Sequence, residues 1–128
     1  MKYREKVKII ANDIASNCLG EHGCRNCVKE CIMLEQYMTY PGETFKNFLS
    51  TGEFDKLVSY SCNLCKQCTL VCPKKFEFAD FFLEIRKDFV DENNGNSPFK
   101  GHNSINMHQK LSFSNMFCTS EKGGDNNE

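Results

Sequence analysis

Four cysteines placed within eleven residues constrain the fold of this chain more than any other feature of its sequence. They follow the pattern C-x2-C-x2-C-x3-C-P, which runs from Cys62 to Pro73. A second and less regular group lies upstream and comprises Cys18, Cys24, Cys27 and Cys31. Metal sites seldom exist in an unfolded chain, so binding at such cysteines is coupled to folding. We therefore expect the backbone to be organised around whatever these eight thiols bind.

The total cysteine content bears on the compartment and on the kind of site. Nine cysteines in 128 residues, an odd number, argue against a disulfide scaffold. The segment 1–15 has no continuous apolar core and no small-residue cleavage site, so we expect no signal peptide. In a reducing cytoplasm, the predicted location, clustered thiols are typical metal ligands.

Charge and hydropathy exclude two other classes of partner. The formal net charge of −1 gives no general electrostatic reason to bind nucleic acid. No apolar run reaches the roughly 18–20 residues that a membrane span needs. We therefore expect neither a nucleic-acid partner nor a transmembrane segment.

The downstream pattern has the spacing found in bacterial ferredoxins, which bind 4Fe–4S clusters. A 4Fe–4S cube needs one thiolate on each iron, and three cysteines separated by two residues each can wrap one side of it. Backbone N–H groups in such a loop point at the sulfides and stabilise their negative charge. In two-cluster ferredoxins the fourth cysteine binds the other cluster. The pattern therefore predicts one cluster and calls for a second.

The upstream cysteines supply the second site. Three of them repeat the last three positions of the pattern, and Cys18 takes the first position with five residues, instead of two, before Cys24. We expect crossed ligand sets. Cluster 1 would be held by Cys18, Cys24, Cys27 and Cys72. Cluster 2 would be held by Cys62, Cys65, Cys68 and Cys31. Two residues could modify cluster 1: His22 as a hydrogen-bond donor or iron ligand, and Cys118 as a substitute ligand, although a loop histidine and a free thiol are the simpler interpretations.

Apolar spacing predicts a mostly α-helical chain. Helices are expected over residues 2–17, 24–40, 43–51 and 53–60, with a loop over 17–23. A continuous helix over 24–40 would place Cys24, Cys27 and Cys31 on one face. Gly52 is well placed to end the third helix, and the fourth is expected to bury Phe54, Leu57 and Val58.

The clearest helical periodicity follows Pro73 and predicts an amphipathic helix over 77–91. Its apolar residues are Phe78, Phe81, Phe82, Ile85 and Phe89. The composition after residue 93 is typical of a linker, followed by a weak helical candidate. We expect residues 1–92 to form a two-cluster domain, 93–117 to add the linker and a weak C-terminal helix to it, and 118–128 to be a disordered polar tail.

The chain resembles the α-helical ferredoxin domain of heterodisulfide reductase-like iron–sulfur oxidoreductases and related respiratory subunits. The resembling segments are CRNCVKECIMLEQYMTYPGETFKNF, YSCNLCKQCTLVCPKKFEFADFFLEIRKDFV and, more weakly, NMHQKLSFSNMF. The resemblance implies two cysteine-rich cluster loops packed between short helices, and two 4Fe–4S clusters that relay electrons. It also implies a redox protein partner, or a C-terminal catalytic domain of a longer chain.

No catalytic residue is predicted, because the sequence shows no nucleophile–base pair, phosphate-binding glycine loop or paired carboxylates. The chain is interpreted as an electron-relay module of an oxidoreductase. Two other functions stay open. Paired C-x2-C units can hold zinc in a structural or interaction module. A redox sensor would need a basic surface, and Lys66, Lys74 and Lys75 lie near the cysteines, although offsetting cluster charge explains them as well.

Overall fold

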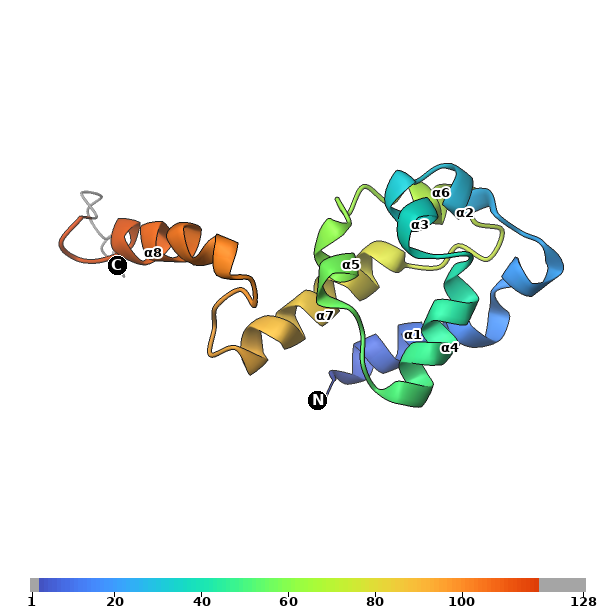
Figure 1. The fold of residues 1–128 in the computed structure, drawn as a ribbon, viewed down its shortest axis with the longest axis horizontal. Helices are drawn as coiled ribbons and strands as arrows, with labels where there is room; N and C mark the ends of the chain where they lie inside the picture. Colours follow the sequence, from blue (N-terminus) through green and yellow to red (C-terminus); the bar gives the residue numbers. More distant parts are fainter. Residues whose placement is uncertain (1–2, 118–128) are drawn as a thin grey trace, which may run out of the picture.

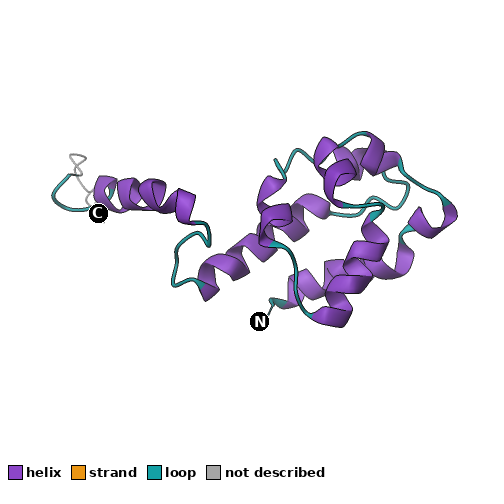
Figure 2. Cartoon of the chain, viewed as in Figure 1, coloured by secondary structure: helices purple, strands orange, loops and turns teal. Residues whose placement is uncertain are grey.

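A computed structural model describes residues 3–117, and all of its regular structure is helical (Figure 1, Figure 2). The elements are α1 (Glu5–Asn17), η1 (Leu19–His22), α2 (Asn26–Lys29), α3 (Ile32–Tyr37), α4 (Pro41–Thr51), α5 (Lys56–Ser61), α6 (Gln67–Val71), α7 (Phe78–Glu92), η2 (Lys100–His102) and α8 (Asn103–Ser112), where η marks a 3-10 turn. The predicted mostly α-helical fold is confirmed, and so is the end of the first helix before Cys18.

Aromatic side chains fill the core where α1, α4 and α7 pack together (Figure 1). The ring centroid of Phe45 lies 4.6 Å from that of Phe81 and 5.9 Å from that of Phe54. The Phe45–Phe81 pair is edge-to-face, and such pairs add about 0.5–1.5 kcal/mol beyond area burial. All five apolar residues that predicted the amphipathic helix are buried in α7, which confirms that prediction.

Charged groups also fasten the N-terminus to α7. The Arg4 backbone N–H donates to Asp88 Oδ2 at 3.0 Å, and Arg4 Nε lies 3.3 Å from Asp88 Oδ1. Asp88 is buried, and a buried carboxylate requires partners because its desolvation is costly. Lys6 Nζ lies 3.5 Å from Glu84 Oε1, one turn before Asp88 in α7. These contacts fix the position of the start of α1. The position of Cys18, which directly follows the C-terminal end of α1, is therefore fixed as well.

The predicted continuous helix over 24–40 is wrong. This segment forms α2 and α3, and between them Cys31 is extended, with φ −137° and ψ 108°. No glycine or proline marks the break, so apolar spacing did not reveal it. Because the helix is interrupted, Cys31 does not share a face with Cys24 and Cys27. It lines a different cavity from theirs.

Other helix ends follow local capping rules. α4 begins at Pro41, two residues earlier than expected, because proline suits the first helical position. It stops at Gly52, whose φ of 72° confirms the predicted stop. α5 begins after Asp55, whose side chain accepts a hydrogen bond from the Leu57 N–H at 2.7 Å. Leu57 is 52% exposed, so its predicted burial is wrong, whereas the other two predicted core residues of this segment are buried.

The segment after α7 leads away from the helical core to α8 (Figure 1). The weak helix predicted there is present, and its larger apolar side chains, including Ile105 and Leu111, are exposed. The predicted polar tail over 118–128, with Cys118, lies outside the described residues.

Candidate metal-cluster sites

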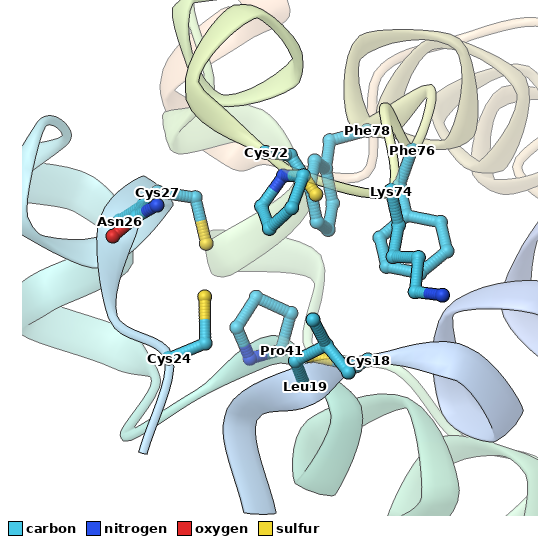
Figure 3. Close-up of a pocket in the computed structure, with 11 residues that line it drawn as sticks. Cys18, Leu19, Cys24, Asn26, Cys27, Pro41, Cys72, Lys74, Phe76 and Phe78 are labelled. Atoms are coloured by element: carbon cyan, nitrogen blue, oxygen red, sulfur yellow. The ribbon is translucent and has the colours of Figure 1, made fainter. Parts of the chain in front are cut away.

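One cavity collects the four cysteines that are expected to hold cluster 1. Cys18 follows α1, Cys24 precedes α2, Cys27 lies in α2 and Cys72 follows α6. Figure 3 shows the sulfurs of Cys24 and Cys27 pointing toward one another, with the Cys72 sulfur directed into the same space. The rest of the lining is Leu19, Asn26, Pro41, Pro73, Lys74, Phe76 and Phe78. Segments far apart in the chain thus place four thiols around one largely apolar space.

The long gap before Cys24 does not remove Cys18 from this cavity. Residues of the gap form η1, and the Cys24 N–H donates to the Leu19 carbonyl at 3.2 Å. Gly42 supports Cys18 from the other side, since a Cβ at Gly42 would lie 2.8 Å from the Cys18 Cβ. Such a contact is too close for two carbon atoms. A glycine is therefore required where the first turn of α4 passes behind Cys18.

Arg25 fastens the same loop. Its Nη1 donates to the carbonyls of Gly20 and Cys24, both at 2.8 Å, and its guanidinium lies 4.9 Å from the centroid of the Tyr40 ring. A guanidinium over an aromatic face is attracted by the ring quadrupole. The turn between Cys18 and Cys24 is therefore held by hydrogen bonds to the Leu19 and Gly20 carbonyls.

A second cavity collects the four cysteines that are expected to hold cluster 2. Cys31 separates α2 from α3, Cys62 follows α5, Cys65 lies in the loop and Cys68 lies in α6. The remaining lining is Glu30, Ile32, Met33, Leu34, Ser61, Asn63, Lys66, Gln67, Ala79 and Phe82. The predicted grouping of eight cysteines into two sets of four is thus the grouping that the two cavities display.

The loop from Cys62 to Cys68 has an unusual backbone. Leu64 and Lys66 have φ of 59° and 63°, in the left-handed region that side chains other than glycine seldom adopt. Such residues cost about 1–3 kcal/mol each and cluster at functional loops. In this conformation the Leu64 N–H donates to Cys62 Sγ at 3.3 Å. The left-handed backbone of this loop therefore directs the Leu64 N–H to the Cys62 sulfur. Hydrogen bonds of this kind to ligand sulfurs are typical of cluster-binding loops.

Solvent reaches the two sets of thiols unequally. In the first cavity Cys27 and Cys72 are buried and the other two cysteines are partly exposed. In the second cavity Cys68 is buried, while Cys65 is exposed. A centre bound in the second cavity would therefore lie nearer the surface on its Cys65 side.

Burial affects the protonation of the most enclosed thiols. Burial, and after it the proximity of the neighbouring cysteines, raises the pKa of Cys27 to about 12 and that of Cys68 to about 11. At neutral pH both thiols stay protonated unless a positive charge compensates the thiolate. Deprotonating Cys27 in the first cavity and Cys68 in the second therefore requires a cationic centre beside each, which iron supplies.

The donor set of each cavity fits a 4Fe–4S cube, which takes four thiolates. A single zinc ion needs its sulfur ligands at about 2.3 Å from one point. Among residues 3–117, no group of three or more His, Cys, Asp or Glu side chains is arranged to hold a metal ion. The four thiols of each cavity line one common space.

Other residues singled out from the sequence have varied positions. His22 is exposed and lines neither cavity. Lys74 lines the first cavity and Lys66 the second. Lys66 Nζ also lies 3.5 Å from both Glu77 and Asp80 at the start of α7, so its charge already has partners. In the part of the chain described, no helix combines the length and apolar character that membrane crossing requires.

Two residues that matter for these sites had no signal in the sequence. Gly42 follows Pro41, and neither residue indicates from the sequence a contact with Cys18. Arg86 lies within the predicted helix over 77–91, where no local pattern distinguishes it from other cations. Its side chain in fact donates to the carbonyl of Cys62. Both roles depend on residues that are distant in sequence, so no local pattern could have indicated them.

A helical domain with two cavities, each lined by four cysteines, defines a class of proteins that bind two thiolate-ligated centres. Residues 8–77, which include all eight of these cysteines, match the family described as 4Fe-4S dicluster domain. The match covers more than half of the 128 residues, so the chain belongs to this family. It is therefore a ferredoxin-like iron–sulfur domain with a role in electron transfer, and that role implies a redox partner. No curated protein and no solved structure matches the sequence.

Proposed function

We propose that the chain binds two 4Fe–4S clusters through crossed ligand sets and relays single electrons between them. Cys18, Cys24, Cys27 and Cys72 would hold cluster 1, and Cys31, Cys62, Cys65 and Cys68 would hold cluster 2. The observation that carries this proposal is the division of eight thiols between two cavities, four in each. Cluster 1 would take three cysteines from the upstream group and Cys72 from the downstream group. Cluster 2 would take three cysteines from the downstream group and Cys31 from the upstream group.

The crossing would hold the two clusters close together. Cys68 and Cys72 belong to α6 and its C-terminal end, and they line different cavities. A helix of five residues is about 7.5 Å long. Cys27 and Cys31 flank the end of α2 in the same way. Electron transfer falls steeply with distance, so cavities separated by one short helix suit a two-step relay.

The chain's own residues would position and shield the clusters. A bound 4Fe–4S cluster supplies one-electron redox chemistry. Buried phenylalanines, including Phe76 and Phe78 at the first cavity, exclude water there. Exposed Cys65 leaves the second cavity open, so electrons would be exchanged with a partner through cluster 2. Exposure and hydrogen bonds to sulfur are the levers by which a protein sets cluster potential.

The wider context follows from the sequence resemblance. We infer a cytoplasmic subunit, or N-terminal module, of a heterodisulfide reductase-like iron–sulfur oxidoreductase, with residues 1–92 as the cluster domain and 93–117 as its linker and C-terminal helix. Its partner would be a redox protein or a catalytic domain of a longer chain. The exposed thiol side of the second cavity is the expected contact.

Reconstitution without oxygen tests the number and type of clusters. The purified chain is loaded with iron and sulfide, desalted, and assayed for iron, acid-labile sulfide and zinc. We expect about eight irons and eight sulfides per chain, since each cube contains four of each. After dithionite reduction, the EPR spectrum should show spin coupling between two neighbouring clusters. About four irons would leave only one cluster, and zinc without sulfide would replace the relay by a structural zinc module.

A further inference from the structure

Arg86 joins α7 to the loop that carries cluster 2. Its Nε donates to the carbonyl of Ser59 at 2.8 Å, and its Nη2 donates to the carbonyl of Cys62. These carbonyls lie in the last turn of α5 and just beyond it, where helical carbonyls lack partners within the helix. Ser59 is fully buried. One guanidinium thus holds the backbone at the point where the chain enters the second cavity.

An aromatic layer covers the guanidinium. Its central carbon lies 5.4 Å from the centroid of the Tyr60 ring. Tyr60 in turn packs edge-to-face with Phe99 at 5.2 Å. His102 lies 5.5 Å from Phe99, and its Nδ1 is 2.6 Å from Ser97 Oγ. Residues just after α7 therefore contact Tyr60, whose ring lies over the Arg86 guanidinium.

The charge of Arg86 acts on Cys62. The Arg86 guanidinium donates to the Cys62 carbonyl, and the Leu64 N–H donates to Cys62 Sγ at 3.3 Å. Each of these two groups favours the negative form of the sulfur. A fixed cation beside a cluster ligand also favours the reduced cluster, because reduction makes the cluster more negative.

We propose that Arg86 is a positioning residue for cluster 2, which anchors the Cys62 backbone through its two donors and raises the reduction potential of that cluster alone. This inference rests on the proposed function, since it requires a cluster in the second cavity. The first cavity has no comparable contact with Arg86, because none of its lining residues belongs to α7 beyond Phe78.

Two substitutions separate charge from hydrogen bonding. Arg86→Gln removes the charge and keeps a shorter donor. Arg86→Lys keeps the charge but cannot donate in one plane to two carbonyls. Lys87→Gln is the matched control, because Lys87 is the next residue of α7, is exposed and pairs with Glu84 at 2.9 Å. Cys65→Ser serves as a marker, since a changed ligand shifts or removes the redox wave of cluster 2.

The experiment is an EPR-monitored redox titration of the full reconstituted chain and of these variants. We expect Arg86→Gln to move the wave identified by Cys65→Ser to a more negative potential and to leave the other wave in place. Arg86→Lys should keep both potentials near those of the wild type. However, a chelator should remove the iron of cluster 2, about half of the total, severalfold faster from Arg86→Lys than from the wild type. The reason is that the backbone at Cys62 is held less firmly in this variant. Lys87→Gln should match the wild type in both assays.

The proposal is overturned if Arg86→Gln leaves both waves in place, moves both equally, or moves only the wave that Cys65→Ser leaves unchanged. If Arg86→Gln fails to assemble, Arg86→Lys decides, since unchanged iron release would exclude the anchoring role. A failure of the proposed function is visible separately, because the wild-type chain would then lack iron and sulfide before any variant is compared.

Discussion

At the scale of single residues, Gly42 is the clearest case of a residue that would bind no iron itself but on which the position of a proposed ligand, Cys18, depends. A methyl group at this position would lie 2.8 Å from the Cys18 Cβ and 3.3 Å from its sulfur. Neither the first turn of α4 nor the end of α1 can yield easily, because the two helices pack along each other. Overpacking of this kind costs about 1–3 kcal/mol.

We therefore predict that Gly42→Ala lowers the iron content of the reconstituted chain from about eight to about four, through loss of cluster 1. Iron and sulfide analysis measures this directly. Gly101→Ala is the control, since a Cβ there would meet no atom within 4 Å. Full iron content in Gly42→Ala would show that Cys18 is not held as described.

The eight cysteines that line the two cavities could be singled out from the sequence, because thiol spacing is a local property. The pairing of Cys31 with the downstream group could be expected from the same spacing rule. Gly42 and Arg86 could not be predicted. A glycine is needed at position 42 because the Cys18 side chain lies against it. Arg86 holds the second loop because its side chain donates to the Cys62 carbonyl. Both requirements arise only after the chain has folded.

At the scale of helices, α5 delivers Cys62 to the second cavity, and its first turn is held by Asp55. The Asp55 side chain accepts a hydrogen bond from the Leu57 N–H at 2.7 Å, and loss of such a cap costs about 1 kcal/mol.

We predict that Asp55→Ala speeds the loss of visible cluster absorbance in urea by about fivefold, since 1 kcal/mol corresponds to such a factor. Stopped-flow or manual mixing under anaerobic conditions measures this rate. Glu53→Ala, two residues earlier and exposed, should leave the rate unchanged. Equal rates in all three proteins would mean that the start of α5 does not contribute to holding cluster 2.

The helices differ in how far their sequences reveal them. α7 was predictable because five buried apolar residues recur at helical spacing over about three turns. The break between α2 and α3 was not, because residues 24–40 contain no glycine or proline and are compatible with one helix. The extended backbone at Cys31 is explained by its place in the second cavity. Here a requirement of the site overrides local propensity.

At the scale of the whole molecule, two kinds of interaction hold different parts together. Apolar packing among α1, α4, α5 and α7 forms one side, and the cysteine loops around α2, α3 and α6 form the other (Figure 1). The cysteine side has short helices and few buried apolar side chains of its own. We therefore infer that the clusters themselves supply much of its stability, as structural metals do in other small domains.

The central claim is that the ligand sets are crossed, and paired cysteine substitutions test it most directly. Iron and acid-labile sulfide are measured in two double variants after anaerobic reconstitution. Cys24→Ala with Cys72→Ala removes two ligands of cluster 1, so about four irons per chain should remain. Cys65→Ala with Cys72→Ala removes one ligand from each cluster, so both should be depleted and little iron should remain. The reverse result, with more iron in the second double variant than in the first, would assign Cys72 to the cluster of Cys65 and contradict the crossing.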